Sequence, residues 1–187
     1  MRLFQFFIAC LLLTNCSDEE EETTVVAQAT LSRISNVTDS TYTIGPDIAG
    51  KAMVETIDNG VRLTISVEGL TPNSRHAVHL HLGSCEAPGA HWNQSSEDSF
   101  CEATSLGVTW AKPKAGDVGN VNTDGQGNGS LTVETDLWSV GTSDEKDILG
   151  AVVIIHQKGE EFLDHCFGNH DHVHDANAKI ACGTIEP

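Results

Sequence analysis

Short runs in which apolar and polar residues alternate recur along the chain and predict β-strands. The clearest is Val61–Val67 (VRLTISV), in which every second residue is apolar. A period of two is typical of a strand with one buried face. Asn59-Gly60 stands between this run and a second strand-like stretch, Ala49–Ile57, and so predicts a hairpin.

Other runs extend the same pattern. Ala151–Ile155 is continuously apolar and mostly β-branched, as expected of a strand that is buried on both faces. His76–Leu82 and Gly129–Thr135 alternate in part. The whole pattern predicts eight strands and little helix, with strands near 25–33, 48–57, 61–69, 76–82, 117–122, 129–135, 149–156 and 179–185. Two long stretches without a pattern, 84–116 and 157–178, are predicted to be loops, and loops of this length usually carry function.

The N-terminus predicts export. Residues 1–15 hold one positive charge and an eleven-residue apolar run, Leu3–Leu13, which is too short to span a bilayer and is typical of a signal peptide. Residues 13–16 (LTNC) resemble a bacterial lipobox, so Cys16 is predicted to be the lipidated first residue of the mature protein. The alternative is an ordinary cleaved signal with an incidental cysteine. Residues 16–24 are strongly acidic and predict a solvated tether before a single domain at 25–187.

Composition narrows the function classes. The chain has 187 residues, which suits one domain. It has 27 acidic and 10 basic residues and a net charge of −17. Such a surface excludes nucleic-acid binding, which needs basic side chains to neutralise phosphates, and excludes a polybasic membrane surface. Membrane contact is therefore expected only through the lipid anchor, in the bacterial cell envelope, facing either the periplasm or the cell surface.

The chain contains nine histidines and six cysteines, which indicates that it binds a metal ion or forms disulfides. An exported protein is free to form disulfides. Cys10 leaves with the signal peptide and Cys16 carries lipid, so four cysteines remain and allow three pairings. The four are Cys85, Cys101, Cys166 and Cys182.

Four histidines form a candidate metal site. His79 and His81 lie two residues apart on a predicted strand and therefore share a face. His91 follows in the first long loop, and His156 ends the apolar run 151–155. A site of four imidazoles suits copper, zinc or nickel, and tetragonal geometry favours Cu(II). The alternative for the His79/His81 pair is a pair of plain surface residues.

Several short motifs resemble the copper–zinc superoxide dismutase family and keep that family's order over residues 25–186. They are His79-Leu80-His81, Gly83-Ser84-Cys85, His91-Trp92-Asn93, 116–121 (GDVGNV), 149–156 (LGAVVIIH) and 181–185 (ACGTI). The resemblance implies an all-β fold, an eight-stranded Greek-key β-barrel (an immunoglobulin-like sandwich) with two long functional loops. This agrees with the strand count above.

The resemblance also implies a set of site residues. The copper ligands match His79, His81, His91 and His156. His91 matches the imidazolate that bridges copper to zinc, and a family disulfide matches Cys85–Cys182. Cys101 and Cys166 would then link the two long loops, the alternative being two free thiols.

This chain departs from the family pattern at the zinc site. Residues 92–116 contain no histidine, and Lys114 stands where the family has a zinc ligand. Only His91 and Asp117 remain, and structural zinc wants four ligands, so zinc is predicted to be absent. Glu160, four residues after His156, resembles the residue found in zinc-less, copper-only members.

Two further features bear on function. Lys179 stands where the family has an arginine that guides the anion, and it supplies charge without the planar fork. The second long loop carries His170, His172 and His174, which predict either a second metal site with His91 and Asp117, a copper-loading patch, or a solvated loop.

The function predicted is copper-dependent dismutation of superoxide to oxygen and hydrogen peroxide, with His91 carrying a proton and Lys179 guiding the anion. The alternative is a non-catalytic lipoprotein that binds or hands over copper. A third possibility is an interaction domain that kept the fold and lost the chemistry, against which the retention of all four copper ligands counts. A monomer and a dimer are equally compatible with the sequence.

Overall fold

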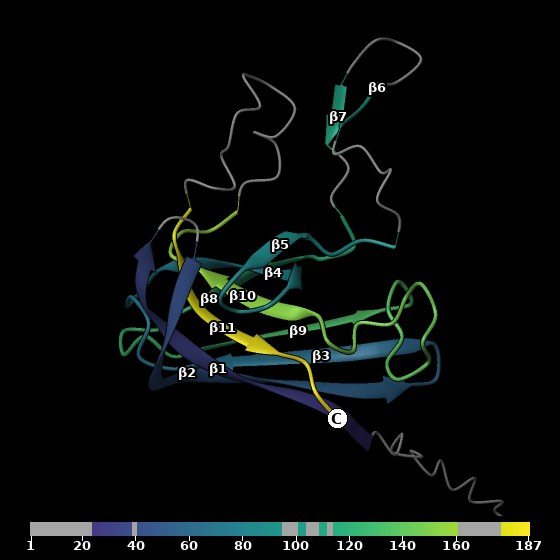
Figure 1. Ribbon diagram of the computed structural model, residues 1–187, viewed down its shortest axis with the longest axis horizontal. Coiled ribbons are helices and arrows are strands. Elements are labelled where there is room, and N and C mark those ends of the chain that lie inside the picture. The colour runs from purple at the N-terminus through teal and green to yellow at the C-terminus, as the bar shows by residue number, and fades with distance from the viewer. Residues whose placement is uncertain (1–23, 39–40, 95–100, 104–108, 112–113, 161–176) are drawn as a thin grey trace, which may run out of the picture.

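The computed structural model describes residues 24–38, 41–94, 101–103, 109–111, 114–160 and 177–187. This part of the chain consists of β-strands, turns and loops, which confirms the all-β prediction (Figure 1). The strands are β1 (Thr24–Thr38), β2 (Thr41–Ile57), β3 (Gly60–Val67), β4 (Arg75–Gly83), β5 (Pro88–His91), β6 (Cys101–Ala103), β7 (Thr109–Ala111), β8 (Asp117–Asn122), β9 (Gly129–Thr135), β10 (Val152–His156) and β11 (Lys179–Thr184). Within these ranges, no helix has the length and apolar character that a membrane span requires.

Nine strands form one sheet in which every neighbouring pair is antiparallel. The order is β5-β4-β10-β11-β1-β2-β3-β9, and β8 also pairs with β4. The strands β8 and β9 follow each other in sequence, but no ladder joins them, so hydrogen bonds do not close the sheet into the predicted barrel. The strands β6 and β7 form a separate hairpin that stands away from the main sheet (Figure 1).

All eight predicted strands are present, but the first two are longer than predicted and β5, β6 and β7 lie inside the predicted loop 84–116. The strand β1 continues to Thr38 and β2 begins at Thr41. Their ladder contains register shifts near Ser32 and Ile34. A β-bulge interrupts the period of two, so a bulged strand does not display regular alternation in its sequence. The predicted β2–β3 hairpin is present, with residues 58 and 59 as its two-residue loop.

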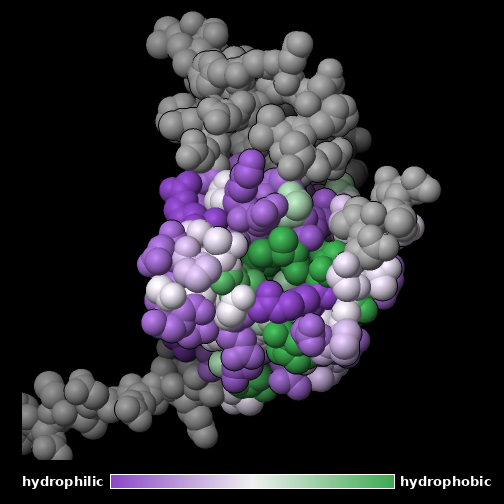
Figure 2. Space-filling view, turned by 90° about the vertical axis from the view of Figure 1, so that its left-hand side faces the viewer, coloured by the Kyte–Doolittle hydropathy of each residue, from purple (hydrophilic) through white to green (hydrophobic). Residues whose placement is uncertain are grey.

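Burial follows the hydrophobic pattern. Every second residue of β3 is buried, and all five residues of β10 are buried. Val153 and Ile155 of β10 belong to the main core, whereas Val152 and Ile154 face a smaller cluster with Cys182. Both faces of β10 are therefore covered, as its unbroken apolar run predicts. On the side of the molecule shown in Figure 2, hydrophobic residues lie in the middle of a mostly hydrophilic surface.

A disulfide joins Cys85, just after β4, to Cys182 in β11, which confirms that predicted pairing. The predicted Cys101–Cys166 bridge lies outside the description, because the side chain of Cys101 and all of residue 166 are not described. The Cys85–Cys182 bond closes a loop with a sequence separation of 97 residues. In the chain-entropy account, a loop of this size restricts the unfolded chain strongly.

We expect the double variant Cys85→Ala/Cys182→Ala to lose about 2–5 kcal/mol of unfolding free energy. Urea unfolding of the metal-free protein, with and without a reductant, measures the loss. Reduction of the unsubstituted protein should match the double variant, since both release the same loop. A change below about 0.5 kcal/mol in either arm would show that the bond does not constrain the unfolded chain.

Candidate metal centre

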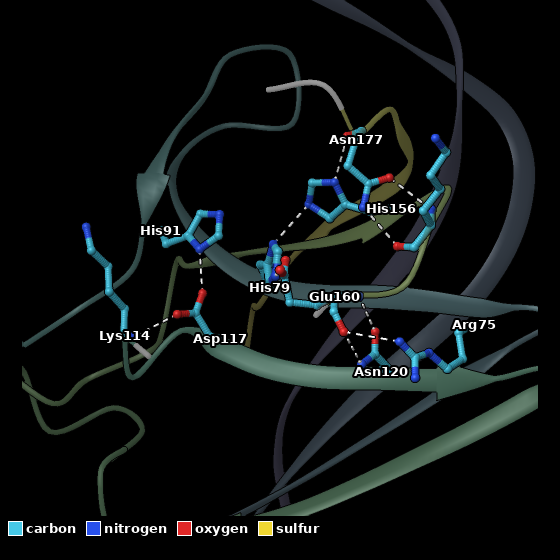
Figure 3. Close-up of polar contacts among 10 residues, drawn as sticks. Arg75, His79, His91, Lys114, Asp117, Asn120, His156, Glu160 and Asn177 are labelled. Carbon is cyan, nitrogen blue, oxygen red and sulfur yellow. Dashed lines mark hydrogen bonds and ion pairs between the residues drawn. The ribbon is translucent and has the colours of Figure 1, made fainter. Parts of the chain in front are cut away.

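Four imidazole rings, two from β4, one from β5 and one from β10, lie close together, and Figure 3 shows three of them, those of His79, His91 and His156. The ring centroid of His79 lies 4.1 Å from that of His91 and 4.7 Å from that of His156. The centroids of His81 and His91 are 4.6 Å apart. His79, His81 and His91 can each offer one ring nitrogen so that these atoms lie within 4.8 Å of one another. The structure therefore brings together all four histidines that were predicted as copper ligands.

Strand pairing explains this convergence. His79 and His81 lie on the same face of β4, and His91 pairs with His81 across the β4–β5 ladder. The strand β10 also pairs with β4, with Ile154 opposite His79, and places His156 at its end. The site thus rests on three strands of the same sheet.

A ring of backbone hydrogen bonds ties the segments at the centre together. The Leu80 amide donates to the Gly116 carbonyl (2.8 Å), the Gly116 amide to the Trp92 carbonyl (3.0 Å), and the Trp92 amide to the Leu80 carbonyl (2.8 Å). A Cβ on Gly116 would stand 2.7 Å from the carbonyl oxygens of both Leu80 and Trp92, so only glycine fits there. Each of these three residues is next in sequence to a polar residue of the site, His79, His91 or Asp117.

Oxygen acceptors outside the cluster fix the protonation of three rings. The Nδ1–H of His81 donates to the Gly89 carbonyl (2.9 Å), and the Nδ1–H of His156 donates to the Asn177 carbonyl (2.9 Å). The Nδ1–H of His91 donates to Oδ1 of Asp117 (2.5 Å). A carbonyl or carboxylate oxygen only accepts, so each of these three rings carries a proton on Nδ1.

His79 is held the other way round. Its Nε2 lies 3.3 Å from Oε2 of Glu160, so its Nδ1 points into the cluster. That Nδ1 is 3.1 Å from Nε2 of His156. Two nitrogens that each lie about 2.0–2.1 Å from one metal ion are separated by a distance of this order. In the metal-free protein this pair forms a hydrogen bond, in which the His79 ring donates and Nε2 of His156 accepts, because Nδ1 of His156 carries its proton towards Asn177.

Glu160 is itself held in place by β4 and β8. Its carbonyl oxygen accepts from Arg75 (3.3 Å) and from the Asn120 side-chain amide (3.1 Å), and its amide donates to Oδ1 of Asn120 (2.6 Å). A Cβ on Gly159 would come within 2.8 Å of Nε of Arg75, so this close approach favours glycine. These contacts fix the backbone of Glu160, whose carboxylate lies beside His79 (Figure 3).

Both carboxylate oxygens of Asp117 accept a hydrogen bond from the protein. Besides the bond from His91, its Oδ2 accepts from the backbone amide of Lys114 (2.6 Å), and its side chain is 1% exposed. Burial alone would raise the pKa of Asp117, but the hydrogen bond and charge of His91, together with His79 and the Lys114 amide, lower it below its usual value. The carboxylate is therefore ionised and orients His91.

Burial also decides the charge of the imidazoles. It lowers the pKa of His81 to about 3 and that of His156 to about 2, and it lowers the pKa of His79. The like charges of neighbouring imidazoles and of Lys179 add to the effect for His81 and His156. The rings are consequently neutral at pH 7, which is the form that binds a metal ion.

We expect acid to destabilise the metal-free protein. An unfolded histidine titrates near pH 6.5, but His81 and His156 in the folded protein resist protonation until about pH 3 and about pH 2. Between these limits the unfolded state binds more protons, so stability that is present above pH 6.5 is lost as the pH falls. The slope approaches about 1.4 kcal/mol per pH unit for each ring.

Urea unfolding free energies at about pH 7.5, 6 and 5 measure this slope. The variant His81→Gln removes one titrating ring and should give a shallower slope. Equal unfolding free energies across this range in the unsubstituted protein would contradict the expectation.

The residues present fit a metal ion bound by nitrogen. Nε2 of His81 is buried and has no hydrogen-bond partner in the described part of the chain. An unpartnered buried acceptor is costly, and a bound metal ion would satisfy it. Imidazoles suit copper, zinc and nickel. A second metal ion is less favoured at His91 and Asp117, because these two side chains are hydrogen-bonded to each other. The other residues predicted for that site, His170, His172 and His174, lie outside the described residues.

Lys179 stands beside this centre. It begins β11 directly opposite His156 in the β10–β11 ladder, and its Nζ lies 5.5 Å from the centroid of the Tyr42 ring. Sequence reasoning missed Tyr42, Arg75 and the carbonyl of Asn177. Nothing in their spacing marks them, because each contacts the site only through the folded arrangement of strands.

The fold and the site together define a class: an antiparallel β-protein with a cluster of imidazoles that protein oxygens orient from outside. Residues 48–185 match the family described as copper/zinc superoxide dismutase (SODC). The chain belongs to this family, which confirms the resemblance drawn from the sequence.

The chain is also similar in sequence to Cu-Zn superoxide dismutases and in fold to solved structures. Cu-Zn superoxide dismutase 2 of Aquifex aeolicus is 26% identical over 143 residues, covering 74% of this chain and 80% of the relative. Cu-Zn superoxide dismutase of Neurospora crassa is 28% identical over 131 residues, covering 66% and 78%. The fold is similar to that of a SOD-like protein from Bacillus subtilis (TM-score 0.60, 21% identity, 84% and 96% covered) and of Cu/Zn superoxide dismutase from Brucella abortus (TM-score 0.57, 18% identity, 88% and 100% covered).

Proposed function

We propose that this protein dismutates superoxide to oxygen and hydrogen peroxide with a single copper ion held by four histidines. The ligand atoms are Nδ1 of His79 and Nε2 of His81, His91 and His156. One observation carries the proposal: the four rings lie side by side, with centroids 4.1 to 4.7 Å apart for three of their pairs, and contacts with Gly89, Asp117, Asn177 and Glu160 orient them from outside the cluster. Family membership supplies the reaction class.

When bound, copper supplies one-electron chemistry, so that one superoxide is oxidised to oxygen and a second, with two protons, is reduced to hydrogen peroxide. The chain's own residues do the rest. When it does not hold the metal ion, Nε2 of His91 would carry a proton to the reduced product, and the hydrogen bond from Nδ1 to Asp117 would keep the ring oriented. Lys179, beside His156, attracts the anion towards the centre.

We propose that this activity does not need zinc. In a two-metal site the outer nitrogen of His91 would bind the second ion, but here that nitrogen donates to Asp117. Both oxygens of Asp117 already accept hydrogen bonds, from His91 and from the Lys114 amide. The carboxylate thus takes over the orienting role of a second metal.

The test is the decay of superoxide after pulse radiolysis, with the soluble domain from Ser17 onward carrying one equivalent of copper and no zinc. Fast decay supports the proposal. Slow decay with copper demonstrably bound would overturn it and favour the alternative in which the protein binds or hands over copper. Rapid transfer of Cu(I) to a chelator would then identify the handover function.

We also propose that the mature protein begins at Cys16 and is anchored by lipid in the bacterial cell envelope through the acidic tether 16–24. The support is the apolar segment before a cysteine and the acidic run after it. Metabolic labelling with a radioactive fatty acid tests the anchor. Cys16→Ala should abolish labelling and release the protein from membranes, whereas Cys10→Ala should change neither. Labelling that persists in Cys16→Ala would refute the assignment.

A further inference from the structure

We propose that Tyr42 is a positioning residue for Lys179: its ring holds the ammonium group beside the metal centre without neutralising the charge. The inference rests on the proposed function, in which Lys179 attracts the superoxide anion. Nζ of Lys179 lies 5.5 Å from the Tyr42 ring centroid. This is within the range of about 6 Å in which an aromatic face attracts a cation.

A ring serves this purpose better than a carboxylate. The chain carries 27 acidic residues, yet Lys179 makes no ion pair among the described residues. A carboxylate partner would hold the ammonium group, but the pair would have no net charge and would not attract an anion. An aromatic face attracts through its quadrupole and adds no charge, so the positive charge of Lys179 stays available.

Lysine needs such support more than arginine would. Its ammonium group ends a flexible four-carbon stem and lacks the planar fork that fixes a guanidinium group. The backbone places Lys179 well, because Lys179 pairs with His156 at the start of β11. The Tyr42 ring supplies the restraint that the stem lacks.

Tyr42 is in turn anchored near Lys179. It belongs to the β1–β2 arm, formed by residues 33–38 of β1 and 41–48 of β2. Its amide donates to the carbonyl of Glu86 (2.9 Å), the residue after Cys85. Cys85 is bonded to Cys182, three residues after Lys179 on β11.

Apolar packing completes this anchor. Ile34 and Ile44 of the β1–β2 arm pack against the small cluster that contains Val152, Ile154 and Cys182. Tyr42 itself lies before residue 48, where the match to the family begins.

The kinetic test uses copper-loaded protein and three substitutions of Tyr42. Tyr42→Phe keeps the ring and should keep the rate of superoxide decay. Tyr42→Leu should slow the decay about threefold. Tyr42→Glu should slow it about tenfold, and so should Lys179→Met, because the first cancels the charge and the second removes it. Lys51→Met, which removes an exposed lysine from β2, is the matched control and should leave the rate unchanged. An unchanged rate in both Tyr42→Leu and Tyr42→Glu would overturn the proposal.

Two further readouts do not depend on turnover. In the metal-free protein, the ring current of Tyr42 should shift the ε-methylene proton resonances of Lys179 upfield, and Tyr42→Leu should abolish this shift while Tyr42→Phe retains it. In the Cu(II) form, binding of azide, a small monovalent anion, should weaken about threefold in Tyr42→Leu. Absence of the upfield shift in the unsubstituted protein would overturn the contact.

These readouts separate the two hypotheses. If copper-loaded protein fails to dismutate superoxide, the proposed function fails, yet the proton shift and the azide affinity still decide whether Tyr42 positions Lys179. If dismutation is fast but the Tyr42 variants leave the shift and the affinity unchanged, the positioning role fails and the proposed function stands.

Discussion

His156→Ala is expected to slow superoxide decay at least about 100-fold under one equivalent of copper. The substitution removes one of the four ligand nitrogens, the one that lies 3.1 Å from Nδ1 of His79. It also removes the donor to the Asn177 carbonyl. Loss of a ligand lowers copper affinity and the rate together, so both are measured, the first by competition with a chelator and the second by pulse radiolysis.

The interpretation requires that the variant folds. His156 is 1% exposed, so its truncation leaves a cavity, and the thermal unfolding of metal-free variant and metal-free unsubstituted protein must be compared. His156→Gln, which fills more of the space, should show the same kinetic loss with a smaller loss of stability. A folded variant with unaltered rate and copper affinity would show that the copper ion lies elsewhere.

Asp117→Asn is expected to weaken copper binding about 10- to 100-fold. The carboxylate accepts two hydrogen bonds, from His91 and from the Lys114 amide, one at each oxygen. An asparagine can accept only one of them, because its amide nitrogen would face the other donor. The His91 ring then loses either its restraint or its fixed tautomer. Competition with a chelator measures the affinity, and pulse radiolysis should show a parallel loss of rate.

A matched control is Asp144→Asn. Asp144 also accepts hydrogen bonds from a side chain and a backbone amide, those of Ser139 and Lys146, but lies in a surface turn. We expect it to leave copper affinity unchanged. Added zinc should not raise the rate of the unsubstituted protein or rescue Asp117→Asn. A rate that depends on zinc would contradict the view that the carboxylate takes the place of a second metal.

The sequence predicted those features of the fold that depend on local periodicity. The alternation in Val61–Val67 and the continuous apolar run before His156 correspond to a half-buried strand and a fully buried one. The β1–β2 arm was missed because bulges near Ser32 and Ile34 break the alternation on which the prediction relies. The lack of a ladder between β8 and β9 could not be predicted from either strand alone, since closure of the sheet depends on their separation in space.

The sequence predicted which residues form the candidate site, but not which contacts hold their side chains in place. The spacing of His79 and His81 and the order of the family motifs named the residues that the fold brings together. Which nitrogen of each ring faces the centre could not be predicted, because it depends on acceptors such as the Gly89 carbonyl and Glu160. The same is true of Tyr42, which reaches Lys179 only through the packing of the β1–β2 arm.

The bond between His91 and Asp117 has a consequence for how the protein matures. Under the proposed function, an exported chain folds outside the cytoplasm and must collect its metal there. A centre that needs two different ions has an order of loading and can be trapped with the wrong ion in one position. Because a carboxylate within the chain orients His91, maturation becomes a single capture event whose yield follows the copper supply alone.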